Sequence, residues 1–429
     1  MKTSAGNRRM VIYVLLFTMA MINYMDRVAL SVAAKPIAEE FGISPVQMGY
    51  LFSCFLWTYI LCLIPAGMMS DKAGSRTTAL GGLGLWSLAT VVTSMAGSFA
   101  TLVMTRLVMG AGESTSYPAA ARTIREWAPA HERGFATAVF NSGAYAGPAL
   151  GAIFMGVLVG TFGWRVAFAV AGATGALWLV FAIPYYRRPE EARFLGQDEQ
   201  DMILRTRDSE STGAPVARTP LLQLLKSTSM WGVALTQGCG VYTQYLFLTW
   251  LPGYLATTKN LDILHTGAYT ALPYLGAVVL GIMLGRVSDR LLGGAQASEG
   301  KRRGMIIAML LLSSVILLTP LIEQTWLILL LFTVSLTGIS TAISLNLALT
   351  NDLLRSSADA GTATSVTVVG GNLFGVLAPI VTGYVIAASG SYSWAFIIAG
   401  ILLLCGAVIS FTLTRRPIEA QPSAQPVHV

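Results

Sequence analysis

The chain has 429 residues, of which 54% are hydrophobic and only 11% are charged. About a quarter of the residues of an ordinary soluble domain are charged, so this composition excludes a simple soluble globular protein. The formal net charge is +7 and the mean hydropathy is +0.63. We therefore predict an integral membrane protein that carries an excess of positive charge outside its apolar segments.

Twelve apolar stretches follow one another along the chain, each near the roughly 20 residues that a helix needs to cross a hydrocarbon core of about 30 Å. Each stretch ends in turn or charged residues. The stretches cover residues 10–33, 47–70, 77–97, 100–121, 134–157, 163–185, 229–256, 265–288, 304–322, 325–350, 360–386 and 391–414. The sequence thus predicts an all-α protein with twelve transmembrane helices and a lipid bilayer as its surroundings.

The first stretch has features of a secretory signal peptide, because Lys2, Arg8 and Arg9 precede its apolar run. Asp26 and Arg27 interrupt the region where a cleavage site would be expected, and further spans follow. We interpret the segment as an uncleaved first helix.

The basic residues indicate the orientation, since cytoplasmic loops near the spans carry an excess of Lys and Arg. Most of the 28 basic residues lie in the termini and in the loops after even-numbered spans, for example Lys72, Arg122, Arg187, Lys301 and Arg415. Both termini are therefore predicted to be cytoplasmic, in a multi-pass protein of the inner (plasma) membrane. This distribution accounts for the positive charge without a nucleic-acid partner.

A polar stretch at residues 187–228 separates the first six spans from the last six. It predicts a cytoplasmic linker between an N-terminal six-helix bundle, 1–186, and a C-terminal one, 229–416, with a cytoplasmic tail at 417–429. Both halves repeat a local pattern: "GMMSDKAGSR" follows the second span and "GRVSDRLLGG" ends the eighth. The fifth and eleventh spans repeat "GAYAGPALG" and "GNLFGVLAP". Such duplication is typical of secondary transporters, which bind cargo between repeats.

These features resemble the major facilitator superfamily, and the resemblance covers nearly the whole chain. Within that superfamily, four segments in order are similar to the anion:cation symporter family: "NYMDR", "GYLFSCFLWTYILCLIPAG", "RLVMGAGESTSYPA" and "FLTWLPGYL". The resemblance implies two pseudo-symmetric six-helix halves and proton-coupled uptake of an organic anion, such as a sugar acid or an aromatic acid, by alternating access. No cofactor is implied, and the working unit is expected to be a monomer.

Four charged residues fall well inside the predicted spans: Asp26, Arg27, Arg106 and Glu113. Each costs ~2.5–3.5 kcal/mol at mid-span, so that together they oppose insertion by about 10 kcal/mol unless they are paired or face water. Arg106 and Glu113 lie on one helix face about 10 Å apart, which is too far for a direct ion pair with extended side chains. We expect a substrate, or a residue of the first span, to lie between them.

Two interpretations of these charges stay open on the sequence. One is an ion network that locks the first and fourth spans together. The other is a working site, in which an arginine holds the anion because it stays charged at any cellular pH. A carboxylate can carry a proton there when burial makes its charged form costly.

The family resemblance implies a role for each of these residues and for others. Asp26 and Glu113 would be protonation sites, Arg27 a substrate contact, and Arg106 a partner of Glu113 that also touches substrate. The remaining substrate-binding candidates are Tyr24, Tyr59, Asn141, Tyr145, Gln244, Ser344, Asn346 and Asn372, and the gating candidates at the cytoplasmic helix ends are Asp71, Lys72, Arg76, Asp289 and Arg290.

The sequence also departs from the pattern of sugar-acid importers. Ala144 stands where an amide is expected on the fifth span, and the tenth span has no tryptophan. These departures favour a less hydroxylated acid, although Asn372, Tyr242 and Tyr274 could compensate.

Other functional classes have less support in the sequence. A phosphate-binding loop for an ATP-driven pump is missing, since "GAQASEGKRR" lacks the required spacing and hydroxyl residue. The three histidines lie in loops or the tail, and Cys54, Cys62, Cys239 and Cys405 form no metal-binding pattern. We therefore expect neither an enzyme nor a metal site. A proton/drug antiporter and a ligand sensor that does not transport are the remaining alternatives.

Overall fold

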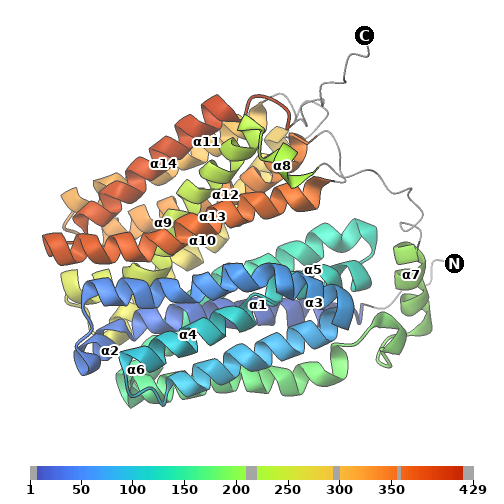
Figure 1. Cartoon of the computed structure of the whole chain (residues 1–429), viewed down its shortest axis with the longest axis horizontal. Helices are drawn as coiled ribbons and strands as arrows, with labels where there is room; N and C mark the ends of the chain where they lie inside the picture. The colour runs from blue at the N-terminus through green and yellow to red at the C-terminus, as the bar shows by residue number, and fades with distance from the viewer. Residues whose placement is uncertain (1–6, 209–219, 293–299, 355–358, 419–429) are drawn as a thin grey trace, which may run out of the picture. The chain divides into compact units, whose positions relative to one another are not determined.

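The computed structural model describes residues 7–208, 220–292, 300–354 and 359–418, and these residues are almost entirely helical (Figure 1). In chain order the elements are α1 Met10–Val32, α2 Ala34–Phe41, α3 Pro45–Thr93, α4 Phe99–Glu113, α5 Ser116–Trp127, η1 Ala130–Glu132, α6 Arg133–Tyr185, η2 Pro189–Glu191, α7 Gln197–Asp208, α8 Leu221–Leu224, α9 Thr228–Thr258, α10 Ile263–Leu292, α11 Lys301–Ser313, η4 Ser314–Leu321, α12 Thr325–Asp352, α13 Ala360–Ser389 and α14 Ser393–Leu413.

All twelve predicted spans fall on helices, but their boundaries differ in four places. The second and third spans form one element, α3, which bends at Gly74 (φ 89°), and the fifth and sixth form α6, which bends at Gly163 (φ 81°). Glycine adopts such positive φ values without steric cost. The fourth span is divided into α4 and α5, and the ninth changes from α-helix to 3₁₀-helix at Ser314.

Eight helices of the described residues are long and apolar enough to cross a membrane. Two of them, α3 and α6, each contain two predicted spans. The fourth span is interrupted after Glu113, and its second part, α5, has a polar composition. The chain is thus a multi-pass membrane protein.

Local sequence explains where several helices begin. Ser44 caps α3 in a reciprocal capping box with Gln47, and Pro45 occupies the first helical position, where a missing N–H costs nothing. Ser98 accepts a hydrogen bond from the backbone N–H of Thr101 and so caps α4.

The chain divides into two compact units. Unit 1 comprises Met1–Ala214, Leu248–Val278 and Thr382–Ala387, and unit 2 comprises Pro215–Phe247, Val279–Val381 and Ala388–Val429. The six-plus-six domain boundaries at residues 187–228 stay a prediction.

In unit 1, α1 packs along α6, and α3 packs on α4, α5 and α6. Three glycines of α6 permit the first contact. A Cβ at Gly143, Gly147 or Gly151 would lie 2.5–2.7 Å from atoms of Phe17, Met21 or Met25 on α1. Small residues at this spacing let helices approach closely in lipid. This contact places α1, which carries Asp26 and Arg27, in the interior of the unit.

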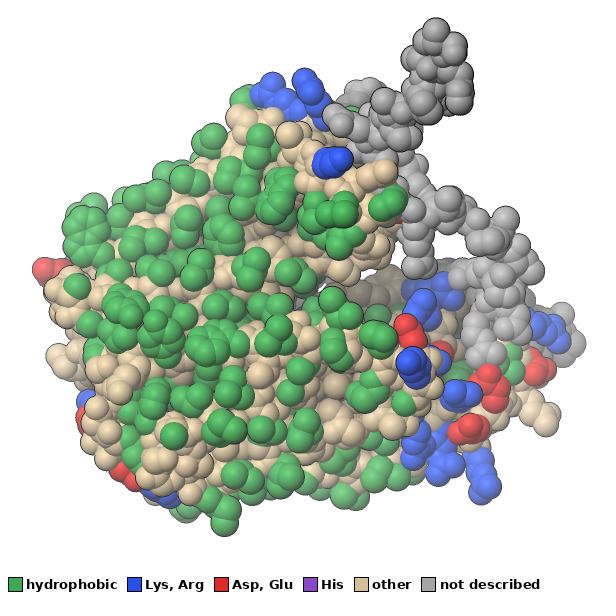
Figure 2. Space-filling model, viewed as in Figure 1, with side chains coloured by type: hydrophobic (Ala, Val, Ile, Leu, Met, Phe, Trp, Pro, Cys, Tyr) green, Lys and Arg blue, Asp and Glu red, His purple; other side chains and the backbone are tan. Residues whose placement is uncertain are grey.

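Apolar side chains cover much of the outer surface, as Figure 2 shows. Leu61, Ile64 and Met95 are each more than 70% exposed. Lys, Arg, Asp and Glu gather at the end of unit 1 that carries α7 (Figures 1 and 2). In unit 2, α11 packs on α12 and α14, and η4 packs on both of these helices.

Candidate functional site

The centre of unit 1 contains a buried ion pair between α1 and α4. Arg27 Nε donates to Glu113 Oε2 at 2.7 Å, and the two side chains are 3% and 0% exposed. On its other side α4 packs closely on α3 at Gly110, where a Cβ would collide with the carbonyl oxygen of Phe55. A residue of the first span, Arg27, thus lies next to Glu113, as expected from the distance between Arg106 and Glu113 on their helix.

Aromatic rings surround the Arg27 guanidinium. Its Cζ lies 4.5 Å from the ring centroid of Tyr24, 5.1 Å from that of Phe55 and 5.2 Å from that of Tyr59. A guanidinium gains about 0.5–2 kcal/mol from such a face, more when it is desolvated. Tyr24 and Tyr59, both predicted from the sequence, therefore lie at Arg27, and Phe55 is a third member that the sequence did not reveal.

Asp26 lies beside this pair on α1 and is 1% exposed. Neither of its carboxylate oxygens has a hydrogen-bond partner among the described residues, and the same holds for Oε1 of Glu113. Glu113, Arg106 and the Trp86 indole are close enough to act on the charge of Asp26. A buried carboxylate without a bonded partner is costly when ionised, and the hydrogen bonding of Asp26 is incomplete within the described residues.

Arg106 is not the ion-pair partner of Glu113, as their spacing on one helix predicted; Arg27 from α1 contacts the carboxylate instead. Instead Arg106 Nη1 contacts Met109 Sδ at 3.0 Å, and its Cζ lies 5.1 Å from the Phe55 ring centroid. Its Nε has no hydrogen-bond partner within the described residues. Arg106 is 3% exposed and still acts electrostatically on Glu113. Asp26, Arg27, Arg106 and Glu113 are thus two buried cations and two buried carboxylates, and Arg27–Glu113 is the direct ion pair that the structure shows between them.

The other candidates in unit 1 are less enclosed. Asn141 is exposed on α6, and Tyr145, one turn further along the same helix, is half-buried. Neither side chain is as deeply buried as Arg27 and Glu113.

Unit 2 contains a polar contact that involves one predicted residue and one that the sequence analysis missed. Asn346 on α12 is 1% exposed, and its Nδ2 donates to Gln237 Oε1 on α9 at 2.9 Å. Gln237 lies two helical turns before the predicted Gln244, and this spacing is the signal that could have found it. Gln244 and Asn372 are half-buried, and Ser344 donates to the Ser340 carbonyl.

Of the predicted gating residues, the structure describes the side chains of Asp71, Lys72 and Arg76. Asp71 is 77% exposed and lies 3.8 Å from Arg122, a partner that the sequence did not assign to it. Arg122 also pairs with Glu126 at 2.7 Å and donates to the Ser70 carbonyl. Lys72 is exposed and Arg76 half-buried. The side chains of Asp289 and Arg290 lie outside the described residues.

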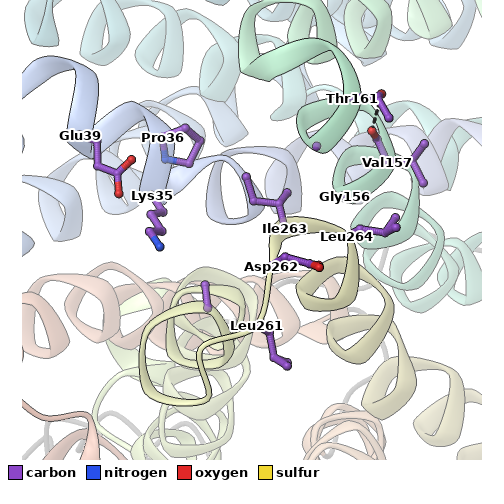
Figure 3. Close-up of a pocket in the computed structure, with 12 residues that line it drawn as sticks. Lys35, Pro36, Glu39, Gly156, Val157, Thr161, Leu261, Asp262, Ile263 and Leu264 are labelled. Atoms are coloured by element: carbon purple, nitrogen blue, oxygen red, sulfur yellow. Dashed lines mark hydrogen bonds between the residues drawn. The ribbon is translucent and has the colours of Figure 1, made fainter.

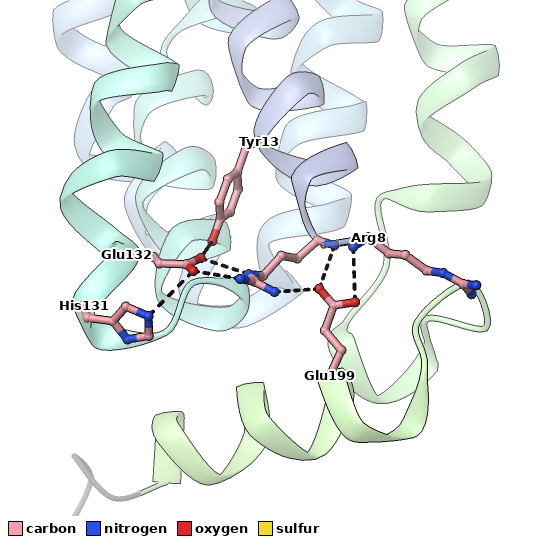
Figure 4. Close-up of polar contacts among 6 residues, drawn as sticks. Arg8, Tyr13, His131, Glu132 and Glu199 are labelled. Carbon is pink, nitrogen blue, oxygen red and sulfur yellow. Dashed lines mark hydrogen bonds and ion pairs between the residues drawn. The ribbon is translucent and has the colours of Figure 1, made fainter. Parts of the chain in front are cut away.

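The start of α1 and the residue before α6 meet helix α7 in an ion network that the sequence analysis also missed, called the Arg9 network below (Figure 4). Arg9 pairs with Glu132 at 2.7 Å and with Glu199 of α7 at 2.8 Å. Glu199 also accepts from the backbone N–H groups of Arg8 and Arg9, and Tyr13 donates to Glu132. The hydrogen bond from Arg9 lowers the pKa of Glu132 below its ordinary value.

A cavity of about 530 Å³ lies elsewhere in unit 1, between α2, α6 and the segment that leads into α10 (Figure 3). Its charged lining residues are Lys35, Glu39 and Asp262. None of the predicted site residues lines it. Among the described residues, no group of three or more His, Cys, Asp or Glu side chains is arranged to hold a metal ion.

The sequence is similar to several bacterial transporters over nearly its whole length. It is 34% identical to the probable sulfoacetate transporter SauU of Cupriavidus necator, with 96% of this chain and 94% of that protein covered. It is 30% identical to the probable galactarate/D-glucarate transporter GudP of Bacillus subtilis (97% and 94%) and 31% identical to a D-galactonate transporter of Escherichia coli (94% and 95%).

The fold is similar to that of a bacterial homologue of the human lysosomal transporter Spinster in an inward-facing, occupied conformation. The TM-score is 0.73 at 17% identity, over 98% of this chain and 100% of that one. The sequence profile of the Major Facilitator Superfamily matches residues 16–298 and 271–428. The chain therefore belongs to the Major Facilitator Superfamily.

Proposed function

We propose that the protein is a secondary active transporter that imports an organic carboxylate together with protons by alternating access. The observation that carries this proposal is the buried Arg27–Glu113 pair with Asp26 beside it. The named relatives are transporters of sulfoacetate and of sugar acids, which supports an organic anion as the cargo.

The chemistry of the site supports coupling between anion and proton. Arg27 offers a planar fork that matches a carboxylate, and Glu113 now occupies it. When Glu113 takes a proton its hold on Arg27 weakens, and the guanidinium becomes available to an arriving anion. When Glu113 releases the proton, the ion pair with Arg27 forms again. Binding of anion and proton is thus linked by a single shared cation.

Asp26 and Arg106 complete the proposed scheme. Asp26 is a second proton carrier, since its oxygens have no hydrogen-bond partner among the described residues. Arg106 is a second cation for the anion. Uptake of one proton with a monoanion is electroneutral, whereas two protons carry one net charge and gain ~2.3 kcal/mol per 100 mV of membrane potential. Two carboxylates permit the second stoichiometry.

We place the protein in the inner membrane as a monomer with both termini in the cytoplasm, as the basic residues favour. The contacts of Asp71 at the predicted cytoplasmic end are weak and exposed, as expected of a gate that opens in each cycle.

The test is uptake by the purified full-length protein in liposomes. Labelled sulfoacetate, galactonate, glucarate, benzoate and lactate are offered with an inward proton gradient and with the gradient collapsed. We expect accumulation of at least one acid only with the gradient, and loss of accumulation in Glu113→Gln. Gradient-independent binding without accumulation would favour a sensor. Proton entry coupled to export of the cargo would favour an antiporter.

A further inference from the structure

The Gln237–Asn346 contact in unit 2 fixes the orientation of both amides. Asn346 Nδ2 donates both to Gln237 Oε1 and to the backbone carbonyl of Val233, each at 2.9 Å. A carbonyl oxygen can only accept, so the atom of Asn346 that faces it must be the nitrogen. The atom of Gln237 that faces this nitrogen must then be its oxygen.

This orientation leaves one acceptor and one donor unused. Asn346 Oδ1 is buried and has no hydrogen-bond partner among the residues that the structure describes. Gln237 Nε2 likewise makes no hydrogen bond to another described residue. A buried polar atom without a partner is destabilising, so the pair is incomplete as it stands.

Three helices of unit 2 enclose the pair. Gln237 lies on α9 and Asn346 on α12, and Gly371 of α13 lies against the Gln237 side chain. A Cβ at Gly371 would come within 2.9 Å of Gln237 Cγ. The absence of a side chain there leaves room for the Gln237 stem, and Asn372, a predicted substrate contact, follows directly.

We propose that Gln237 and Asn346 form a subsite for a hydroxyl group of the cargo acid, an inference that rests on the proposed transport function. A hydroxyl is the group that fits both unused atoms, because its oxygen accepts from Gln237 Nε2 and its hydrogen goes to Asn346 Oδ1. A second carboxylate or a sulfonate would accept from Nε2 but be repelled by Oδ1. The pair therefore selects a hydroxy acid over a diacid or an unsubstituted acid.

Packing alone does not account for this arrangement. Polar side chains often join helices in membranes, and Thr350 does so here: its hydroxyl lies 3.3 Å from Thr367 on α13 and donates to the Asn346 carbonyl. The Thr350 hydroxyl thus finds its hydrogen-bond partners within unit 2. The amide pair instead leaves one donor and one acceptor for a further partner.

The test compares acids that differ in their hydroxyl groups. Binding of gluconate and hexanoate, lactate and propionate, and mandelate and phenylacetate to the full-length protein in detergent is measured by calorimetry. We expect the wild type to prefer the hydroxylated member of at least one pair by about tenfold or more. Gln237→Glu keeps the stem and the acceptor for Asn346 but loses the donor, and Gln237→Leu loses both; each should abolish the preference.

Thr350→Val is the matched control, since it removes a polar contact between α12 and α13 outside the pair and should keep the preference. Equal weakening of both members of a pair by Gln237→Glu and Gln237→Leu would indicate a packing role and overturn the subsite. So would a wild type that accumulates an acid under a proton gradient but shows no preference for hydroxyl groups. A wild type that neither binds nor accumulates any acid would overturn the transport function and the subsite together.

Discussion

Unit 1 contains two clusters of charge that differ in how completely their groups are paired. In the Arg9 network all four carboxylate oxygens of Glu132 and Glu199 accept hydrogen bonds, from Arg8, Arg9 and Tyr13. In the membrane site both oxygens of Asp26 and one of Glu113 have no hydrogen-bond partner among the described residues. A fully bonded network holds one geometry, whereas an incomplete one can take up a proton or a ligand.

The two clusters are also built from different parts of the chain. The Arg27–Glu113 pair joins α1 to α4, whereas the Arg9 network joins α1 to the residue before α6 and to α7. Helix α7 is fixed further by apolar contacts: Ile203 is 2% exposed, and the Phe194 ring just before the helix stacks on Trp127 at 5.7 Å. We infer that the fully bonded Arg9 network fixes the position of α1. The cluster of Asp26 and Glu113 instead leaves carboxylate oxygens available to a proton or a ligand.

Removal of Arg27 should have the largest effect. Arg27→Met leaves Glu113 buried without its ion-pair partner, which costs about 3–5 kcal/mol of the free energy of unfolding. We expect uptake in liposomes to fall to background. Arg27→Lys keeps the charge but loses the planar fork, and it should retain more stability than uptake. Normal uptake by Arg27→Met would contradict the proposed role.

Asp26→Asn should separate coupling from folding. Asp26 has no hydrogen-bond partner in the described residues, so the amide should leave the melting temperature nearly unchanged. Gradient-driven accumulation should fall by about 10²-fold or more, the usual scale for loss of a proton-transfer group. Exchange of labelled for unlabelled acid across the membrane, which needs no net proton movement, should persist. Accumulation equal to wild type would assign the coupling to another group.

Glu199→Ala tests the Arg9 network. It removes the acceptor for two backbone N–H groups and for Arg9, and hydrogen bonds to a charged group contribute about 1.5–3 kcal/mol. Thermal unfolding should shift downward by a corresponding amount, and Glu199→Gln, which keeps one acceptor oxygen, should shift less. Uptake per folded molecule should stay at the wild-type level. A variant with normal stability and lost uptake would place this network in the transport cycle.

The pH dependence of the same network should give the smallest effect. The Arg9 hydrogen bond lowers the pKa of Glu132 below its ordinary 4.5, so the stabilisation is fully present above that ordinary value. It is lost as the pH falls through the lowered folded value. The loss should be about 1 kcal/mol, the scale of a partly exposed pair. Thermal unfolding measured between pH 3 and pH 6 should show this loss of stability in the wild type and not in Glu132→Gln. The same loss in Glu132→Gln would assign the pH dependence to another group.

The sequence determined the membrane helices and the identity of the buried charges. Each helix in lipid must satisfy its own backbone, so apolar length alone located twelve spans. The charged residues Asp26, Arg27, Arg106 and Glu113 could be recognised because they lie inside these apolar spans. The positive φ values of Gly74 and Gly163 changed only the helix boundaries, because each joins two predicted spans into one bent helix. The gating role of Asp71 and the roles of the other site residues stay predictions.

Only the tertiary structure decided which charges and amides meet. Arg27 rather than Arg106 pairs with Glu113. The glycines of α6 let α1 approach that helix closely, and Gly110 does the same for α4 and α3. Gln237 and Asn346, or Arg9 and Glu199, are more than 100 residues apart, and no periodicity within one helix relates them. Helix periodicity gives the face on which a side chain lies, whereas the partner on that face depends on which helix packs there.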